Sequence, residues 1–306
     1  MARKMWDDSS TTHAKTHRLA ELHNFRPVCA AGTLYRAGHT CTLCPDERSS
    51  NALRHACYHD SKAATLPLAV RNRGGLSGDA LLARADRVVL LSSRARELYL
   101  GFGLPKEKIA LVPNFVDDIG FTPDAPAGSE WVYIGRLSEE KGVRSLIAHW
   151  PADEILNVYG DGPLRVEVEL AASEGRGIRY HGPIPHERVP AVLADARGLI
   201  FPSEWAEGGI AQSYVEALAA GRIVVARLGS SVGDDLLSSG FGTVFEEWGD
   251  FTNALKSAGN QSQSALASAR AHYESVFTPE AFAMTIIELY ESLITSPRGG
   301  QPFVES

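Results

Sequence analysis

Residues 131–142 read WVYIGRLSEEKG, and residues 201–221 read FPSEWAEGGIAQSYVEALAAG. In each stretch, an apolar run typical of a buried strand leads through a glycine-containing loop into residues with helical spacing. A strand followed by a helix is the repeating unit of a parallel sheet. The two stretches therefore predict an α/β fold in which charged loops follow the strands.

The same alternation continues outward from these stretches. Strands are predicted at residues 87–91, 109–113, 130–134, 155–159, 178–181, 198–201, 223–226 and 243–245. Two of the intervening segments carry apolar residues at i, i+3, i+4 and i+7, which indicates helices: Val143, Leu146, Ile147 and Trp150, and Ala211, Tyr214, Val215 and Leu218. Gly221 stands where a glycine commonly ends a helix.

Thr278 and Pro279 are typical of a helix N-terminus. The apolar face of this last long helix is predicted to consist of Phe282, Ile286, Leu289 and Leu293.

The prolines and glycines of residues 118–129 predict a linker. It separates a smaller N-terminal unit, residues 1–117, from a complete-looking α/β domain, residues 130–276. Residues 277–306 are predicted to form a helix and tail that pack back on the N-terminal unit.

The composition is that of an ordinary soluble protein, with 44% hydrophobic and 22% charged residues. A formal charge of −7 argues against nucleic-acid binding, which needs a basic face. No apolar run approaches the roughly 18 residues of a membrane span, and the N-terminus has no secretory apolar core. A cytoplasmic location is predicted. Residues 65–82 mix apolar and basic positions, so contact with a membrane surface and an internal helix both stay open.

Cations follow the predicted strand at residues 130–134. Gly135 ends the strand, Arg136 is next, and Lys141 stands where a helix begins. Ligands of parallel sheets bind at the carboxyl edge, and a diphosphate leaving group needs cations there. A surface arginine and lysine near a turn are the ordinary alternative.

Glycines and carboxylates follow the predicted strand at residues 198–201. Glu207, Gly208 and Gly209 precede a helix that contains Glu216. Glycines before a helix let N–H groups approach an anion, and the helix dipole favours a phosphate there. Glu216 is suited to accept hydrogen bonds from ribose hydroxyls. A glutamate on a solvent-facing helix surface is the alternative.

Together with YGDGP at 159–163 and HGPIP at 181–185, these motifs resemble the retaining glycosyltransferases of family GT4. The resemblance covers about residues 16–295. It implies a GT-B fold of two facing Rossmann-like domains, in which the C-terminal domain, residues 130–276, holds a nucleotide-diphosphate sugar.

The resemblance also implies roles in donor binding. Arg136 and Lys141, after Gly135, would neutralise the diphosphate without a required metal ion. Glu216 would hold the ribose, and the main chain near Ile184 would read the base.

Further implied roles concern the transferred sugar. Glu207, Gly208, Gly209 and Ile210 would contact the sugar hydroxyls and the phosphates. His23 matches the histidine that faces the sugar from the N-terminal domain. His23 and Glu207 are therefore the candidate catalytic residues, the chemistry is transfer with retention, and the acceptor is unidentified.

The sequence departs from the family pattern in two places. Glu207 and Glu216 are nine positions apart, one more than the family's paired glutamates, and Gly208 occupies the expected position. Either the loop holds an extra residue and Glu207 still reaches the sugar, which we favour, or the carboxylate is lost.

The second departure is the N-terminal unit, residues 1–117, which is incomplete compared with the Rossmann-like N-terminal domain that the resemblance implies. Only 22 residues precede His23, which allows one short strand. This predicts a truncated start, a partner chain or homo-oligomer that completes the sheet, or a remnant that binds nucleotide and transfers poorly.

The cysteines follow the spacing C-x11-C-x2-C-x12-C: Cys29, Cys41, Cys44 and Cys57. Four ligands at such spacing suit a structural tetrahedral zinc site. Free thiols are the main alternative, and disulfides are disfavoured without an export signal.

Three functions are consistent with these motifs. The chain is an active glycosyltransferase, a nucleotide-sugar-binding subunit or pseudoenzyme that works with another chain, or a zinc-stabilised interaction module. Arg136, Lys141 and Glu216 favour the first two over the third.

Overall fold

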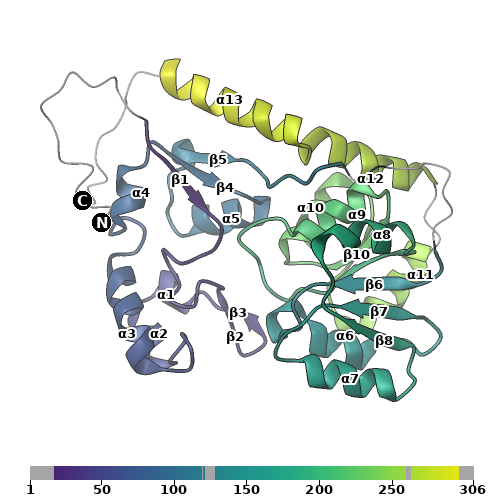
Figure 1. The fold of residues 1–306 in the computed structure, drawn as a ribbon. Coiled ribbons are helices and arrows are strands. Elements are labelled where there is room, and N and C mark those ends of the chain that lie inside the picture. The colour runs from purple at the N-terminus through teal and green to yellow at the C-terminus, as the bar shows by residue number, and fades with distance from the viewer. Residues whose placement is uncertain (1–16, 119, 121–127, 260–262, 296–306) are drawn as a thin grey trace, which may run out of the picture.

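Two parallel sheets organise the chain in the computed structural model, which describes residues 17–118, 120, 128–259 and 263–295 (Figure 1). The smaller sheet has the order β1-β4-β5, from β1 (Leu19–Leu22), β4 (Arg87–Leu90) and β5 (Ile109–Leu111). The larger sheet has the order β11-β10-β9-β6-β7-β8, from β6 (Trp131–Ile134), β7 (Leu156–Tyr159), β8 (Ile178–Gly182), β9 (Gly198–Phe201), β10 (Ile223–Arg227) and β11 (Thr243–Phe245). A short antiparallel hairpin joins β2 (Tyr35–Arg36) to β3 (His39–Thr40).

The helices surround and connect these sheets. The N-terminal ones are α1 (Leu43–Asp46), α2 (Ser50–Arg54), α3 (Lys62–Arg71), α4 (Ala80–Arg84) and α5 (Ser93–Gly101). Those that follow are α6 (Val143–His149), α7 (Arg165–Ser173), α8 (Val189–Ala194), α9 (Gln212–Ala219), α10 (Ser231–Ser239), α11 (Phe251–Gly259), α12 (Gln263–Val276) and α13 (Pro279–Thr295). Short 3-10 turns include η4 (Glu139–Lys141) and η5 (His186–Arg188).

The eight predicted strands are all present, within one or two residues at each end. Strand β9 is buried along its whole length, and the larger sheet carries helices on both faces. One face packs on α8, α9, α10 and α12, and the other on α6, α7 and α11. Covering both faces explains why these strands read as continuous apolar runs in the sequence.

The predicted helix faces are buried as expected. In α9, Tyr214, Val215 and Leu218 lie in the core, and Gly221 follows the helix with a φ of 60°. That left-handed conformation is readily adopted by glycine and ends the helix. In α6, Val143, Leu146 and Ile147 are buried; Trp150 is buried just beyond the helix end.

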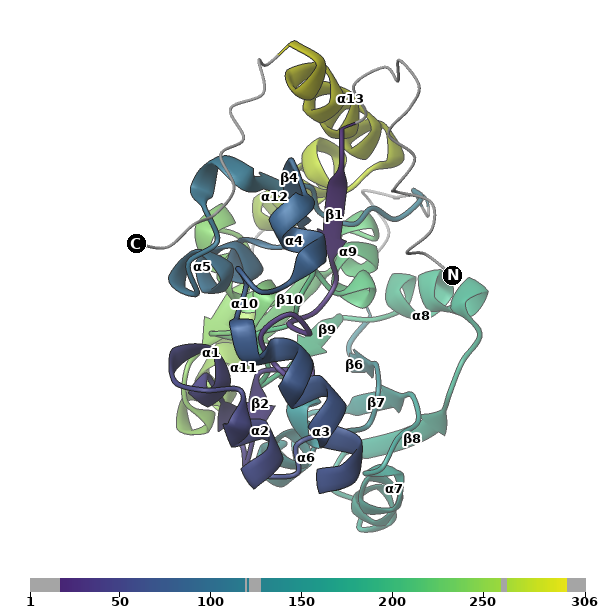
Figure 2. The ribbon, with the colours of Figure 1, turned by 90° about the vertical axis from the view of Figure 1, so that its left-hand side faces the viewer.

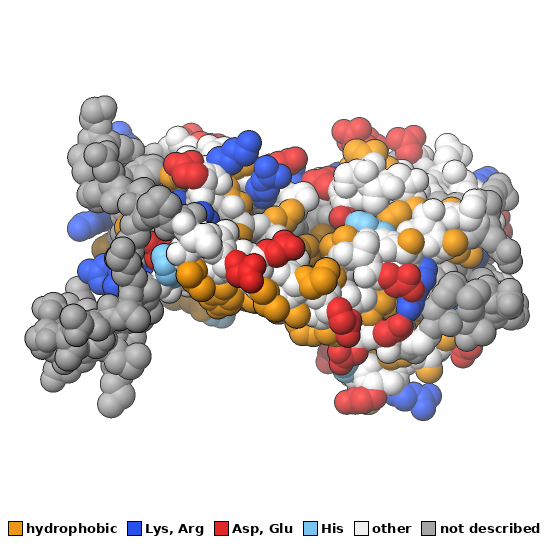
Figure 3. Space-filling model, turned by 90° about the horizontal axis from the view of Figure 1, so that it is seen from above, with side chains coloured by type: hydrophobic (Ala, Val, Ile, Leu, Met, Phe, Trp, Pro, Cys, Tyr) orange, Lys and Arg blue, Asp and Glu red, His pale blue; other side chains and the backbone are white. Residues whose placement is uncertain are grey.

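Helix α13 runs along the top of the molecule and packs on the smaller sheet (Figures 1 and 2). Thr278 accepts the hydrogen bond from the N–H of Ala281 through its Oγ1, at 3.1 Å, which confirms the predicted N-cap. The predicted apolar face contacts Val89, Leu91 and Val112 through Phe282, Ile286 and Leu289. A second set of apolar side chains on α13 is exposed, and the view from above shows such side chains interspersed with acidic ones along this ridge (Figure 3).

The smaller sheet bears on two predictions. In the described stretch before His23, residues 17–22, one short strand, β1, is present, and it pairs there with β4 alone. A partner chain or second copy that extends this sheet stays a prediction. The predicted linker, residues 118–129, and the tail beyond residue 295 lie largely outside the described residues.

Within the described part of the chain, the helices are all too short or too polar to span a membrane. On α3, Leu66 and Val70 are exposed. Contact with a membrane surface therefore stays a prediction as well.

Candidate active site

The loops after β6, β7 and β9 meet at the carboxyl edge of the larger sheet. The Gly135 N–H donates to the Tyr159 carbonyl at 3.0 Å, and the Glu204 N–H donates to the Glu140 carbonyl at 3.0 Å. The loop that carries Arg136 and Lys141 therefore lies between the loops that follow the two neighbouring strands. This is the edge where ligands of parallel sheets bind.

Glycines allow this close approach of loop backbones. A Cβ on Gly160 would overlap the carbonyl oxygen of Gly135, and a Cβ on Gly142 would overlap that of Pro202. Gly142 also has a φ of 68°, which side chains disfavour. Gly142 and Gly160 thus allow the loops after neighbouring strands to pack closely against each other.

Tyr133 positions the main chain of Arg136. Its buried hydroxyl donates to the Arg136 carbonyl at 2.7 Å. Burial raises the pKa of Tyr133, and the nearby carboxylates of Glu207 and Glu140 raise it further, so the hydroxyl remains a donor. The Arg136 side chain is exposed, and the hydrogen bonds and ion pairs seen among the described residues leave its guanidinium without a partner.

Lys141 and Glu207 form an ion pair between the η4 turn and the loop after β9. The Glu207 side chain is 5% exposed and that of Lys141 is 22% exposed. The Lys141 ammonium also lies 5.1 Å from the ring centroid of Trp205 and 5.6 Å from that of Phe201. The structure therefore holds this cation between one carboxylate and two aromatic rings.

Serine hydroxyls satisfy the rest of the Glu207 carboxylate. Ser231 donates to Oε2 at 2.8 Å, and Ser203 approaches Oε1 at 3.3 Å. Glu207 has a φ of 53°, a strained conformation for a residue with a side chain. The loop brings the Glu207 carboxylate to Lys141. Whether Glu207 also reaches the sugar, the alternative favoured by the sequence, stays a prediction.

The glycines after Glu207 contact the N-terminal part of the chain. A Cβ on Gly208 would overlap the carbonyl of His23, and Gly209 forms a parallel bridge to Leu91. Ile210 is buried in the core of the larger sheet. The loop thus joins the two sheets, and His23 meets it through the main chain.

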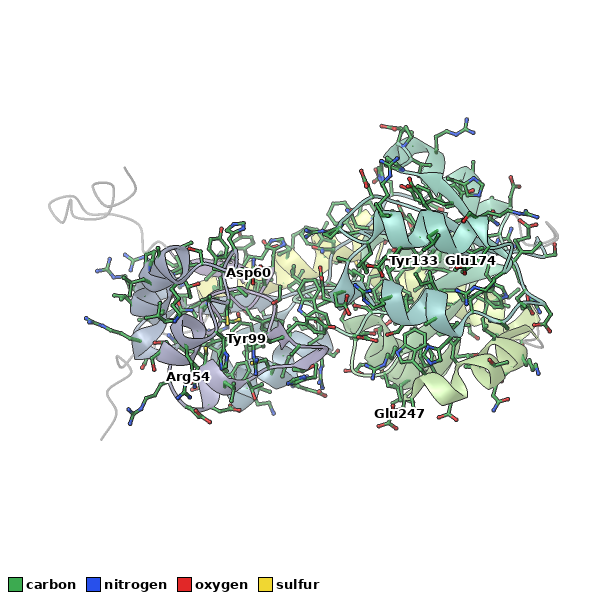
Figure 4. The ribbon with its side chains drawn as sticks, turned by 90° about the horizontal axis from the view of Figure 1, so that it is seen from below. Arg54, Asp60, Tyr99, Tyr133, Glu174 and Glu247 are labelled. Atoms are coloured by element: carbon green, nitrogen blue, oxygen red, sulfur yellow. The ribbon has the colours of Figure 1, made fainter. Side chains whose placement is uncertain are left out.

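The His23 side chain is 62% exposed, and its Nε2 lies 2.8 Å from Glu21 Oε1. The next residue is held by Tyr99, whose hydroxyl donates to the Asn24 carbonyl at 2.8 Å. In Figure 4, Tyr99 lies in the N-terminal half of the molecule and Tyr133 in the C-terminal half. Two buried tyrosines therefore position the two strand-end loops, one in each half.

Glu216 lies on α9 beside a cavity of about 230 Å³. Its carboxylate is buried, and Oε1 lacks a hydrogen bond within the described structure, although His186 Nδ1 lies 3.3 Å away. Burial raises the pKa of Glu216, and His186 partly offsets this effect. The cavity also borders Phe115, Asp117 and Gln212. Ile184, two residues before His186, is half-buried and packs on the core between the larger sheet and α8, α9, α10 and α12.

Tyr35 and Glu204, which no sequence pattern predicted as site residues, connect the β2–β3 hairpin to this site. Glu204 accepts hydrogen bonds from Ser145 and Trp248 at Oε1, each at 2.9 Å, and from the Tyr35 hydroxyl at Oε2, at 3.3 Å. Tyr35 and Glu204 are 169 positions apart in the chain. Local patterns carry no signal for such a contact.

The four cysteines gather beside the hairpin without an evident metal site. Burial raises the pKa of Cys44 to about 11, and the thiols of Cys29, Cys57 and Cys41 contribute, which places all four in one neighbourhood. Among the described residues, no group of three or more His, Cys, Asp and Glu side chains is arranged to hold a metal ion. The zinc site therefore has no structural support and stays a prediction for elemental analysis of the purified protein.

Comparison with known proteins identifies the larger sheet and its helices. Residues 128–258 match the family described as "Glycosyl transferases group 1". The curated 2-deoxystreptamine N-acetyl-D-glucosaminyltransferase of Streptomyces fradiae is 31% identical over an alignment of 208 residues, and the match covers 58% of this chain and 48% of that protein. The chain thus spans about half the length of that relative.

Solved structures share the fold. Anabaena Alr3699/HepE, solved in complex with UDP, has a TM-score of 0.61 at 15% identity, covering 91% of this chain and 72% of the other. Sucrose-phosphate synthase from Thermosynechococcus elongatus has a TM-score of 0.58 at 21% identity, covering 71% and 61%. Residues 128–258 thus match the glycosyl transferases group 1 family, and the chain shares the GT-B fold of these solved structures.

Proposed function

We propose that this chain is a retaining glycosyltransferase of the GT4 type, which moves a sugar from a nucleotide-diphosphate sugar to an acceptor. The observation that carries the proposal is the cluster at one sheet edge: the exposed Arg136, the Lys141–Glu207 pair and the buried Glu216. The family match and the name of the Streptomyces fradiae relative support the same reaction class.

Arg136 and Lys141 would bind the diphosphate. The Arg136 guanidinium is exposed beside the Lys141 loop, and a lysine ammonium has three N–H donors, of which Glu207 occupies one. The main-chain groups near Gly208 and Gly209 add to the site. Two cations and the loop N–H groups would stabilise the leaving group without a metal ion.

Glu216 would hold the nucleoside. Its Oε1 is a buried acceptor without a hydrogen bond within the described structure, beside a cavity lined in part by Phe115 and His186. Two ribose hydroxyls would satisfy that carboxylate. The main chain near Ile184 would read the base.

In the transfer step, the bond between the sugar and the diphosphate oxygen breaks, and the acceptor oxygen bonds to the same carbon from the same face. The acceptor proton passes to a leaving phosphate oxygen. Glu207, from the loop after β9, and the exposed His23, from the N-terminal part, would contact the sugar.

The test is mass spectrometry after incubation with a panel of nucleotide sugars and water. UDP-N-acetylglucosamine with 2-deoxystreptamine belongs in the panel, because the curated relative is named for this sugar and acceptor. We expect slow hydrolysis of one donor and faster turnover with a suitable acceptor. If every donor stays intact, the proposed function is wrong.

The raised pKa of Glu216 predicts pH-dependent nucleotide binding. The carboxylate, not the protonated acid, accepts hydrogen bonds from both ribose hydroxyls. Affinity for the nucleoside diphosphate should therefore fall as the pH drops from neutral into the mildly acidic range, measured by calorimetry. Glu216→Gln should bind more weakly and lose most of this pH dependence, and an unchanged profile would exclude Glu216 from the ribose site.

The raised pKa of Glu216 also determines how this carboxyl group changes the stability of the protein with pH. Because folding raises the pKa of Glu216, its contribution to stability is present below the ordinary pKa and is lost as the pH rises through the folded value. Glu216→Gln should thus be the more stable protein at neutral pH, which thermal unfolding would show.

His23→Ala should slow transfer by about 100-fold and leave nucleotide affinity unchanged. The side chain is mostly exposed, and the contact with Gly208 uses the His23 main chain, so the fold does not depend on the imidazole. Steady-state kinetics and calorimetry separate the two effects. Equal losses in affinity and rate would instead place His23 in the nucleotide site.

A further inference from the structure

Trp205 connects the N-terminal core to the Lys141 cation. The indole lies in the loop after β9, half-buried, and packs on the core of the smaller sheet, in which the next residue, Ala206, is buried. The Lys141 ammonium lies 5.1 Å from its ring centroid. One side chain therefore contacts both halves of the molecule.

The indole is not held in place by a hydrogen bond. Its Nε1 is buried without a hydrogen-bond partner in the described structure. An unsatisfied buried donor opposes burial, so other interactions must hold the ring in this position. Two interactions of the Trp205 ring are present: it packs on the core of the smaller sheet, and its face attracts the Lys141 ammonium.

The Lys141 side chain needs interactions that fix its conformation. A lysine side chain has many rotamers, and ordering it costs conformational entropy. Glu207 fixes the ammonium from one side and is itself held by Ser231 and Ser203. The rings of Trp205 and Phe201 are the other surfaces within cation–π range.

We propose that Trp205 is a positioning residue for Lys141. Its ring face holds the ammonium at the place where the donor diphosphate binds, and the N-terminal core holds the ring. This inference rests on the proposed function, in which Lys141 binds the diphosphate. It makes the short N-terminal part a contributor to donor binding, through packing behind the indole.

The test replaces Trp205 with tryptophans that carry one, two and three ring fluorines, by site-specific incorporation. Fluorine withdraws charge from the ring face and hardly changes the ring's size, so packing is kept while cation–π attraction falls. Trp205→Phe and Trp205→Leu extend the series. The matched control is the same fluorinated series at Trp150, whose ring packs on Phe251 and whose Nε1 donates to the Glu154 carbonyl.

The measurement is calorimetric affinity for whichever of UDP, GDP and ADP binds the unmodified protein most tightly. We expect the affinity to fall stepwise with each fluorine added at Trp205. Trp205→Leu should lose about tenfold in affinity, and Trp205→Phe should lose less than Trp205→Leu. The Trp150 series should bind like the unmodified protein.

Equal affinity along the Trp205 series, or an equal loss along the Trp150 series, would overturn the inference and leave donor binding intact. If the unmodified protein binds none of the three nucleotides, the result contradicts the proposed function, and the inference about Trp205, which rests on that function, is then wrong as well.

Discussion

Lys141→Ala should lower the free energy of unfolding by about 3 kcal/mol, because it leaves the buried Glu207 carboxylate without its cation. It should also weaken nucleoside-diphosphate binding by about 1 to 3 kcal/mol, the range for lost charge-assisted hydrogen bonds. Urea denaturation measures the first effect and calorimetry the second.

A double variant separates the two effects. In Lys141→Ala with Glu207→Gln, the buried charge is gone, and Ser203 and Ser231 can still hydrogen-bond to the amide. Stability should largely return, whereas nucleotide affinity should not. Recovery of both would mean that Lys141 acts on binding only through the fold, and the diphosphate role would be wrong.

Gly208→Ala should destabilise the fold by about 3 kcal/mol and abolish most transfer activity. The new Cβ would overlap the carbonyl of His23 and crowd the N–H of Asn24, which are main-chain atoms and cannot move aside alone. The loop and the end of β1 must therefore separate. That separation moves His23 away from Glu207.

Gly101→Ala is the matched control, because a Cβ there meets nothing within 4 Å. Its unfolding curve in urea should stay within about 0.5 kcal/mol of the parent protein, as for most surface substitutions. A Gly208→Ala protein as stable and active as this control would show that the two halves do not need the close contact.

Sequence patterns predicted the strands from β4 to β11 and the helices α6, α9 and α13. Strands buried on both faces read as continuous apolar runs, and a helix buried on one face leaves a repeat of i, i+3 and i+4 in the sequence. Helices α1 and α2 were not predicted, because with four and five residues they have too few turns to show a repeat. Helices α3 and α4 overlap residues 65–82, where an internal helix was one of the two interpretations, but their bounds were not predicted.

The candidate site divides in the same way. Arg136, Lys141 and Glu216 were predicted because each follows a strand within a motif of recognisable spacing. Trp205, Ser231 and Tyr35 were not, because their parts depend on residues distant in sequence: Ser231 meets Glu207 24 positions away, and Trp205 meets Lys141 across two strand-end loops.

The sequence by itself thus determined an α/β chain with two cations and a pair of carboxylates at the ends of its strands. Only the tertiary structure decided that Glu207, despite its extra residue of spacing, reaches Lys141, and that Gly208 lies against His23. The physical reason is that the path of a glycine-containing loop follows from what packs on both sides of it. Those neighbours, Leu91, His23 and Ser231, come from other parts of the chain.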